Sequence, residues 1–344
     1  KIVASTATIK NADEQIKALY ASGYSQFPAQ GIDINDSFFA VISTLEDKPA
    51  RKYLGCMGIG TSPTMMMICV MSSLLFATRY LASLKKFSND VIDSFWTLTI
   101  YFNTLRELGG AIIRVIDDIQ SRYNFLKGTK FEDIYEINEP ENISYNEYHE
   151  LTSRIPSEAI GKVLLELENK YPKDKTKRVY DFLLASNMIS VGVDVGRLGT
   201  MIVVGQPKLT AEYIQATSRV GRSTPGLVIA TYNQAKSRDR SHFEQFYQYH
   251  QTFYKYVEAT SLTPFADRAR DRALQTLYIM LCRYWIDDLR GNTAAKNYKK
   301  DDPRLNQVRE YILDCVNKVD AQEYENVKKE LEKIEEEWEA RCCP

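Results

Sequence analysis

The chain has 344 residues, of which 44% are hydrophobic and 26% charged, and its formal net charge is −1. This composition excludes a disordered or fibrous protein, and the length suits two or three compact units. Because the surface as a whole carries almost no net charge, it does not attract a polyanion, so any nucleic-acid binding needs a local groove.

Cysteine spacing and hydropathy narrow the setting of the protein. The six cysteines form no CxxC pair and have no histidine at ligand spacing, so we predict no metal site, no disulfide framework and a reduced, cytoplasmic location. No signal peptide opens the sequence. The most apolar stretch, Thr64–Thr78, is shorter than the roughly 20 residues of a membrane span and follows Ser62-Pro63, a typical helix start. We therefore expect a buried core helix and no membrane contact.

From about residue 54 to residue 232, short β-branched or aromatic runs alternate with helical stretches. The helical stretches are 63–83, 104–122, 156–170 and 210–220. The predicted strands are Tyr53–Met57, Leu98–Phe102, Tyr148–Thr152 (the weakest), Val179–Leu184, Met201–Val204 and Leu227–Tyr232. This alternation predicts an α/β domain over 51–235, a parallel sheet with helices on both faces. The loops at the carboxyl ends of such strands bind ligands.

Helical patterns alone follow the last strand, so we predict an all-helical C-terminal extension over 236–344. Its helices are expected near 241–258 and 268–290, with one or two more over 303–338. The last has an apolar seam at alternating spacings of three and four, suited to packing on the body of the protein or on a partner. Upstream of the sheet, residues 21–50 are rich in glycine, proline and polar residues and are predicted to be a linker.

The strongest chemical signal is the run Gln215-x-x-x-Arg219-x-Gly221-Arg222. Two arginines three residues apart can project into one cleft. Planar guanidinium groups suit phosphate oxygens and can stabilise the charge that builds on a transferring phosphoryl group. Thr210 fits the N-cap of the preceding helix and Gly221 fits its end, which would place both arginines at the C-terminal end of that helix.

This run resembles motif VI of superfamily 2 helicases, whose arginine fingers reach ATP bound by the opposite lobe. The stretch from Ser186 to Asp194 is similar to motif V of the same family. The resemblance implies a RecA-like sheet, a nucleic-acid phosphate contact for Ser186, and nucleotide contacts for Gly192, Asp194 and Gln215. Val191 stands where many relatives carry arginine, so one interlobe contact is missing or moved.

Two further stretches resemble helicase motifs. Asn103 and Thr104 follow a predicted strand and open a helix, as in motif IV, and a helix N-terminus with a hydroxyl suits a backbone phosphate. Thr152, after the weakest strand, is a further candidate for the same contact. The tripeptide Thr6-Ala-Thr8 closes a strand-like opening and resembles motif III, which implies a role for both threonines in coupling the two lobes.

The sequence has no GxxxxGK[ST] loop to cradle phosphates and no Asp-Glu-x-His or Asp-Glu-Ala-Asp run to hold Mg²⁺. We therefore expect a fragment in which residues 1–20 end the first lobe and ATP and Mg²⁺ are bound mainly by the missing part. Such a fragment would be inactive alone. Three blocks, Ala4–Tyr20, Gly192–Asn233 and Tyr249–Arg272, resemble the large helicases of the DISARM anti-phage defence system, which implies a possible protein partner in a defence complex.

The resemblance thus predicts the second motor lobe of an ATP-dependent helicase or translocase that acts on DNA or RNA. The alternative is a catalytically silent nucleic-acid-binding or scaffolding module with a degenerate helicase fold. A nucleotide-binding enzyme with a doubly wound sheet would show a glycine-rich first βα turn with an acidic residue about 20 positions later, and the sequence shows neither. His242, His250 and the aromatic residues between them are expected to pack the helical extension rather than stack on bases.

Overall fold

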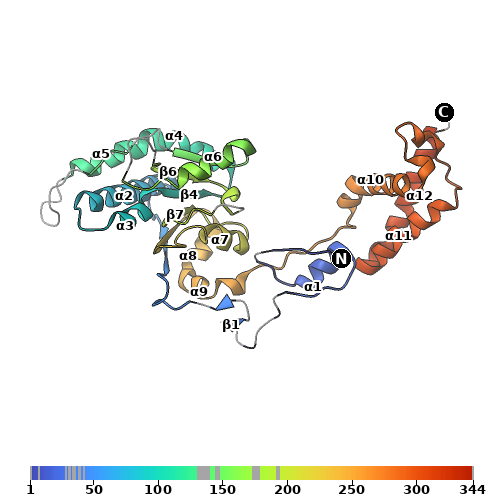
Figure 1. The fold of residues 1–344 in the computed structure, drawn as a ribbon, viewed down its shortest axis with the longest axis horizontal. Helices are drawn as coiled ribbons and strands as arrows, with labels where there is room; N and C mark the ends of the chain where they lie inside the picture. The colour runs from blue at the N-terminus through green and yellow to red at the C-terminus, as the bar shows by residue number, and fades with distance from the viewer. Residues whose placement is uncertain are drawn as a thin grey trace. The chain divides into compact units, whose positions relative to one another are not determined.

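The computed structural model describes residues 2–6, 8–27, 43–129, 140–143, 148–172, 179–190 and 194–342, together with residues 29, 32, 36, 37, 40 and 41. The chain divides into two compact units (Figure 1). Residues 1–8 and 40–258 form the sheet unit, and residues 9–39 and 259–344 form the helical unit. The predicted boundary near residue 235 therefore lies inside the sheet unit, and part of the predicted linker groups with the helical unit.

In the part of the chain that the structure describes, six parallel strands form the main sheet in the order β3-β8-β7-β4-β6-β5. Their bounds are β3 (Arg51–Met57), β4 (Leu98–Phe102), β5 (Tyr148–Leu151), β6 (Phe182–Ala185), β7 (Thr200–Val204) and β8 (Gly226–Tyr232). Two short strands, β1 (Asp36–Ser37) and β2 (Ala40–Val41), precede them. All six predicted strands are present, and the predicted fold class is confirmed.

Helices cover both faces of the sheet, because alternate side chains of a strand point to opposite faces. Ile100 and Ile202 face one layer, formed by α2 (Pro63–Ser83), α4 (Leu105–Arg114) and α5 (Gln120–Gly128). Tyr101 and Met201 face the other layer, formed by α6 (Ser157–Leu167), α7 (Thr210–Thr217) and α9 (Phe246–Gln251). The helix α8 (Ser237–Glu244) lies between β8 and α9 in the chain.

Helix α2 is long and apolar enough to cross a membrane by length and composition, but it packs on the sheet. Ser62 caps it by accepting a hydrogen bond from the Met65 amide at 3.1 Å, with Pro63 as the first helical residue. Met71 and Leu75 lie in the core. The predicted core helix is confirmed.

Several local predictions are wrong. Residues 2–6 form no strand, and they have no ladder partner among the described residues. The predicted helix over 104–122 is divided, because a π-helical turn (Val115–Ile119) separates α4 from α5. An additional helix, α3 (Asn89–Trp96), packs beside α2 and begins where Ser88 Oγ accepts a hydrogen bond from the Val91 amide at 3.5 Å.

The aromatic residues of α9 pack on the sheet rather than in the helical extension. Tyr249 is buried in the core layer of α7, and the His250 ring lies 4.9 Å from the ring of Tyr53 in β3. A turn of 3₁₀ helix (Phe253–Tyr256) follows them in the same unit. The stretch therefore does not pack the helical extension as predicted, and its Tyr247 is 75% exposed.

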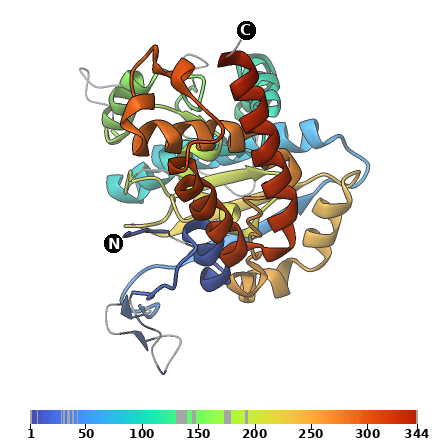
Figure 2. The ribbon, with the colours of Figure 1, turned by 90° about the vertical axis from the view of Figure 1, so that its right-hand side faces the viewer.

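The helical unit contains α1 (Ala12–Tyr20), α10 (Asp267–Trp285), α11 (Arg304–Val319) and α12 (Tyr324–Cys342). Figure 2 shows α11 and α12 side by side, and α1 lies against α11 although it comes from the other end of the chain. The predicted apolar seam of α12 packs inward, with Val327 and Leu331 buried against α10 and α11. Short 3₁₀ turns at 287–289, 294–297 and 321–323 connect these helices.

Candidate functional site

Both arginines of the predicted cluster lie in the turn after α7 (residues 218–225). Arg219 donates a hydrogen bond from Nη2 to the carbonyl oxygen of Ser190. Arg222 donates from Nη1 to Asp194 Oδ1 and from Nε to the carbonyl oxygen of Ser218 at 3.2 Å. Two guanidinium groups and one carboxylate, predicted from separate motifs, therefore meet in one cluster.

The two ends of α7 differ from the prediction. The helix ends at Thr217, before Gly221 is reached, so both arginines belong to the following turn rather than to the helix end. Thr210 is the first helical residue and not the N-cap. Its amide donates to both carboxylate oxygens of Glu258, at 3.0 and 2.9 Å. A carboxylate at this position satisfies free amides and complements the positive end of the helix dipole.

Glycines bring this turn close to the connection between β6 and β7 (residues 186–199). Gly221 has φ of +66° and its amide donates to the Leu198 carbonyl oxygen at 2.8 Å. A Cβ on Gly221 would lie 2.5 Å from Gly226 Cα, and one on Gly199 would lie 2.5 Å from the Ser94 carbonyl oxygen. Only glycine fits such positions. The turn and the connection are thus held against each other by the backbone.

The electrostatics of the cluster differ between its two arginines. Burial lowers the pKa of Arg219, the neighbouring Arg222 charge lowers it further, and Asp194 acts in the opposite direction. The side chains of Arg222 and Asp194 are 32% and 77% exposed. Ion pairs at such exposure contribute about 0–1 kcal/mol, so a competing anion can separate this pair at small cost.

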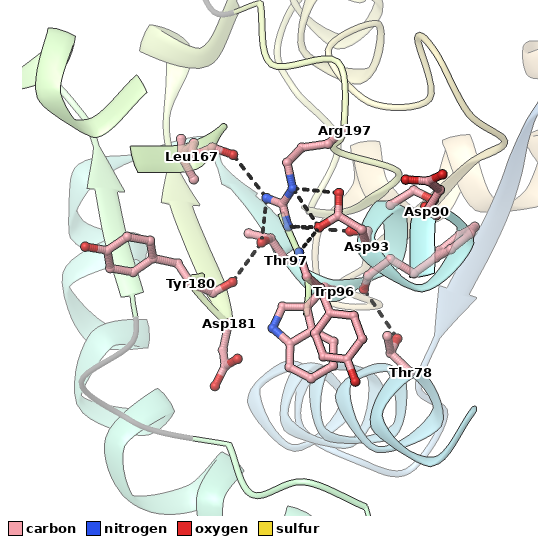
Figure 3. Close-up of polar contacts among 12 residues, drawn as sticks. Thr78, Asp90, Asp93, Trp96, Thr97, Leu167, Tyr180, Asp181 and Arg197 are labelled. Atoms are coloured by element: carbon pink, nitrogen blue, oxygen red, sulfur yellow. Dashed lines mark hydrogen bonds and ion pairs between the residues drawn. The ribbon is translucent and has the colours of Figure 1, made fainter. Parts of the chain in front are cut away.

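A buried arginine anchors the β6–β7 connection (Figure 3). Arg197 donates from Nε and Nη2 to Asp93 on α3, with an Nη2–Oδ1 distance of 2.9 Å. Its Nη1 donates to Thr97 Oγ1 at 3.0 Å and to the Leu167 carbonyl oxygen at 3.1 Å. Asp93 also accepts a hydrogen bond from the Tyr171 amide at 2.6 Å. One guanidinium therefore joins α3, α6 and the connection that carries Asp194.

A second buried ion pair supports the same edge of the sheet. Arg79 of α2 donates to Asp181 Oδ1 at 2.6 Å and to the Trp96 carbonyl oxygen at 2.9 Å, and its guanidinium lies 4.1 Å from the centre of the Trp96 ring. Thr97, next in the chain, donates to the Tyr180 carbonyl oxygen at 2.7 Å. Sequence reasoning identified neither Arg197 nor Arg79, because nothing local marks their partners.

The residues predicted to contact a nucleic-acid strand lie at the carboxyl edge of the sheet. Asn103 donates from Nδ2 to the carbonyl oxygens of Val204 and Gly205, at 2.9 and 3.1 Å, and so ties the end of β4 to the end of β7. Thr104 is exposed, and its hydroxyl accepts a hydrogen bond from the Glu107 amide at 3.2 Å in the first turn of α4. Thr104 therefore combines a free surface with a helix N-terminus.

The other two predicted hydroxyl contacts are buried. Thr152 is 0% exposed, donates to Glu150 and accepts a hydrogen bond from the Arg154 amide at 3.2 Å. Ser186 is 5% exposed and donates to Asn187 Oδ1 at 3.3 Å. The hydroxyls of Thr152 and Ser186 thus make internal contacts, so a surface role predicted for them does not fit this arrangement.

The remaining predicted residues are scattered. Gln215 is half-buried on α7, and Gly192 lies outside the described residues. Thr6 is exposed and Thr8 half-buried. Within the described residues, neither threonine has a hydrogen bond or ion pair with any other predicted site residue. The described residues also include no cluster of three His, Cys, Asp or Glu side chains that could hold a metal ion.

The site residues therefore fall into two groups at opposite edges. Because β6 and β7 are parallel, their connection must return from the carboxyl edge, where Ser186 lies, to the amino edge before Thr200. The turn with Arg219 and Arg222 directly precedes β8 and lies at the same amino edge. One connection thus runs from the edge that holds Thr104 to the edge that holds the two arginines.

The sheet unit has the RecA-like fold of helicase lobes, and residues 125–224 match the family of the Helicase conserved C-terminal domain. This match includes Ser186, Asp194, Gln215 and both arginines, but it begins after Asn103 and Thr104. The chain is 42% identical over 347 residues to the DISARM protein DrmA of Bacillus paralicheniformis (strain ATCC 9945a / NCIMB 11709 / CD-2). That similarity covers 99% of this chain and 29% of the length of the relative.

Solved structures of helicases are also similar to this chain. The DUF1998 helicase MrfA, in a crystal structure with DNA and AMPPNP, is 14% identical with a TM-score of 0.47, over 80% of this chain and 30% of that one. The Mycobacterium smegmatis helicase Lhr, bound to ssDNA and AMP-PNP, is 12% identical with a TM-score of 0.44, over 91% of this chain and 31% of that one.

Proposed function

We propose that the chain forms the second motor lobe of an ATP-dependent nucleic-acid helicase or translocase. In this role Arg219 and Arg222 act as arginine fingers toward Mg-ATP that the first lobe of the same parent protein binds. The observation that carries the proposal is the cluster itself, since two guanidinium groups and the Asp194 carboxylate meet at one edge of a RecA-like sheet.

The chemistry of these groups suits a nucleotide. Guanidinium forks match phosphate oxygens and can stabilise the charge that develops on the γ-phosphoryl group during transfer. The exposed Asp194 carboxylate can accept hydrogen bonds from ribose hydroxyls, and Gly192 and Gln215 remain proposed nucleotide contacts beside it. Because the Arg222–Asp194 pair is exposed, ATP can draw the two side chains apart without a large free-energy cost.

The carboxyl edge is the proposed strand-binding side, for DNA or RNA. Thr104 is the residue that we assign to a backbone phosphate, because it is exposed and its hydroxyl lies at the N-terminus of α4. Ser186 and Thr152 would support this edge from inside rather than touch the strand. The similarity to a DISARM protein supports a role in antiviral defence, with a protein partner of such a complex, in the cytoplasm.

Replacement of Arg219 with alanine in the intact protein tests the proposal. Arginine fingers contribute roughly 10³–10⁵-fold to kcat, so the variant should hydrolyse ATP slower by orders of magnitude while its ATP affinity stays largely intact. Lys162→Ala is a matched control, since this lysine is exposed on α6 in the same unit. An unchanged kcat for Arg219→Ala would remove the finger role, whereas the absence of ATP hydrolysis by the unchanged intact protein would favour the silent scaffold.

A further inference from the structure

Arg51, the first residue of β3, donates hydrogen bonds to the backbone on both sides of Arg219. The guanidinium of Arg51 donates from Nε to the carbonyl oxygen of Val220 at 2.8 Å and from Nη2 to that of Ser218 at 3.5 Å. These two carbonyls belong to the residues that flank Arg219 in the chain. Arg51 and Val220 are 169 positions apart in the sequence, so this contact depends entirely on the fold.

The carbonyl oxygens of the turn after α7 need hydrogen-bond donors from outside the helix. The last carbonyls of a helix have no partner within the helix, and a turn that leaves them unpaired is free to shift. A planar guanidinium fork is already arranged to hold two acceptors, so little freedom is lost when it binds them. The Ser218 carbonyl oxygen also accepts a hydrogen bond from Arg222 Nε at 3.2 Å, so Arg51 and Arg222 share one acceptor.

A second contact from the same strand holds the helix just before the turn. The hydroxyls of Tyr53 and Thr217 lie 3.3 Å apart, and Arg51 Nη1 donates to the Tyr53 hydroxyl at 3.5 Å. The Gly226 amide donates to the Ala50 carbonyl oxygen at 3.3 Å, which holds the far side of the turn to the same point of the chain. The turn is therefore bracketed by the start of β3.

We propose that Arg51 is a positioning residue for Arg219 and Arg222. It fixes the backbone from which both side chains project, and its hydrogen bonds to described residues go to Val220, Ser218 and Tyr53 rather than to the side chains of Arg219, Arg222 or Asp194. The inference rests on the proposed finger role of these two arginines. A displacement of about 1 Å in a positioned catalytic group can cost about 100-fold in rate, so a loosened turn should lower kcat without weakening substrate binding.

The test is a set of variants of the intact protein, assayed for nucleic-acid-stimulated ATP hydrolysis. Arg51→Ala should lower kcat roughly 10–100-fold and leave the KM for ATP and the half-saturating concentration of nucleic acid unchanged. Arg51→Lys keeps the charge but loses the fork, so it should fall between Arg51→Ala and the unchanged protein. Lys52→Ala, an exposed neighbour in β3, is the matched control and should retain full activity.

The double variant separates positioning through Arg219 from a general structural effect. If part of the effect of Arg51 passes through Arg219, Arg51→Ala should cause a smaller loss in an Arg219→Ala background than in the unchanged protein, because effects on one shared unit are not additive. An equal loss in both backgrounds, or normal kcat for both Arg51 variants, would overturn the inference while leaving the finger role intact. Failure of Arg219→Ala to lower kcat would instead refute the proposed function. If Arg51→Ala does not fold, normal kcat of Arg51→Lys is the overturning result.

Discussion

Replacement of Asp93 with alanine should destabilise the sheet unit strongly. Asp93 accepts hydrogen bonds from Arg197 Nε and Nη2 and from the Tyr171 amide, and the side chains of Arg197 and Asp93 are only 6% and 4% exposed. Removal of the carboxylate leaves a buried guanidinium whose acceptors are Thr97 Oγ1, the Leu167 carbonyl oxygen and, at 3.5 Å, the backbone carbonyl oxygen of residue 93. Loss of one partner of a buried ion pair costs about 3–5 kcal/mol, a large part of a typical stability of about 5–15 kcal/mol.

The assay must report on the sheet unit alone, because a chain with two units need not unfold in a single step. Hydrogen exchange at the amides of β4 and β7, measured at increasing urea concentrations, meets this need since the two strands pair with each other. Asp194→Ala, which breaks an exposed pair, should lose no more than about 1 kcal/mol. The double variant Asp93→Asn/Arg197→Met should recover part of the loss, because it removes both charges. If Asp93→Ala loses no more than Asp194→Ala, Arg197 is not the anchor that we describe.

Two further predictions concern the turn after α7 and its support. Gly221→Ala should destabilise the sheet unit by more than the roughly 1–3 kcal/mol of a strained left-handed residue, because its Cβ would also meet the Gly226 backbone. The control Gly110→Ala, in an open part of α4, should stabilise the unit slightly. Equal urea midpoints for the two variants would contradict this prediction. Burial lowers the pKa of His250 from its ordinary value of 6.5, and the ring fits the neutral form, accepting from the Tyr213 hydroxyl at Nε2 and donating from Nδ1 to the Phe246 carbonyl oxygen, both at 2.8 Å. The unfolded chain therefore binds a proton more readily below about pH 6.5, so stability should fall as the pH drops through that range. His250→Phe should reduce this slope, and an unchanged slope would contradict the prediction.

Local patterns were sufficient for the strands and for the arginine cluster. β4 has the bounds expected from its sequence because all five of its residues are buried, and a parallel strand covered on both faces is a continuous apolar run. The spacing of Arg219 and Arg222 is a property of one short segment. In contrast, α3 is only eight residues long, too short for its apolar period to be distinguished from an irregular stretch.

The supports of the site were beyond local patterns. Arg197 and Asp93 are 104 positions apart, and Thr210 and Glu258 are 48 apart. The order of the strands brings the first pair together, since β4 lies beside β7 in the sheet although β5 and β6 lie between them in the chain. A single sequence does not reveal that order. For Thr152 and Ser186 the sequence predicted contacts with a nucleic-acid phosphate, but both side chains are buried. A hydroxyl after a strand can turn inward as well as outward, and the local sequence does not distinguish the two.

The connection between β6 and β7 is held at both ends, which has a consequence for the proposed motor. Its first residue is fixed at the carboxyl edge, where the Ser186 amide donates to the Leu151 carbonyl oxygen at 3.3 Å, and Arg197 fixes its other end on α3. The contacts of the fingers, to the Ser190 carbonyl oxygen and to Asp194, both fall between these two anchors. If ATP draws Arg219 and Arg222 away, the contacts that they lose therefore lie between the two anchors. Two fixed ends on either side of these contacts are an arrangement that would let the proposed nucleotide edge influence the proposed nucleic-acid edge.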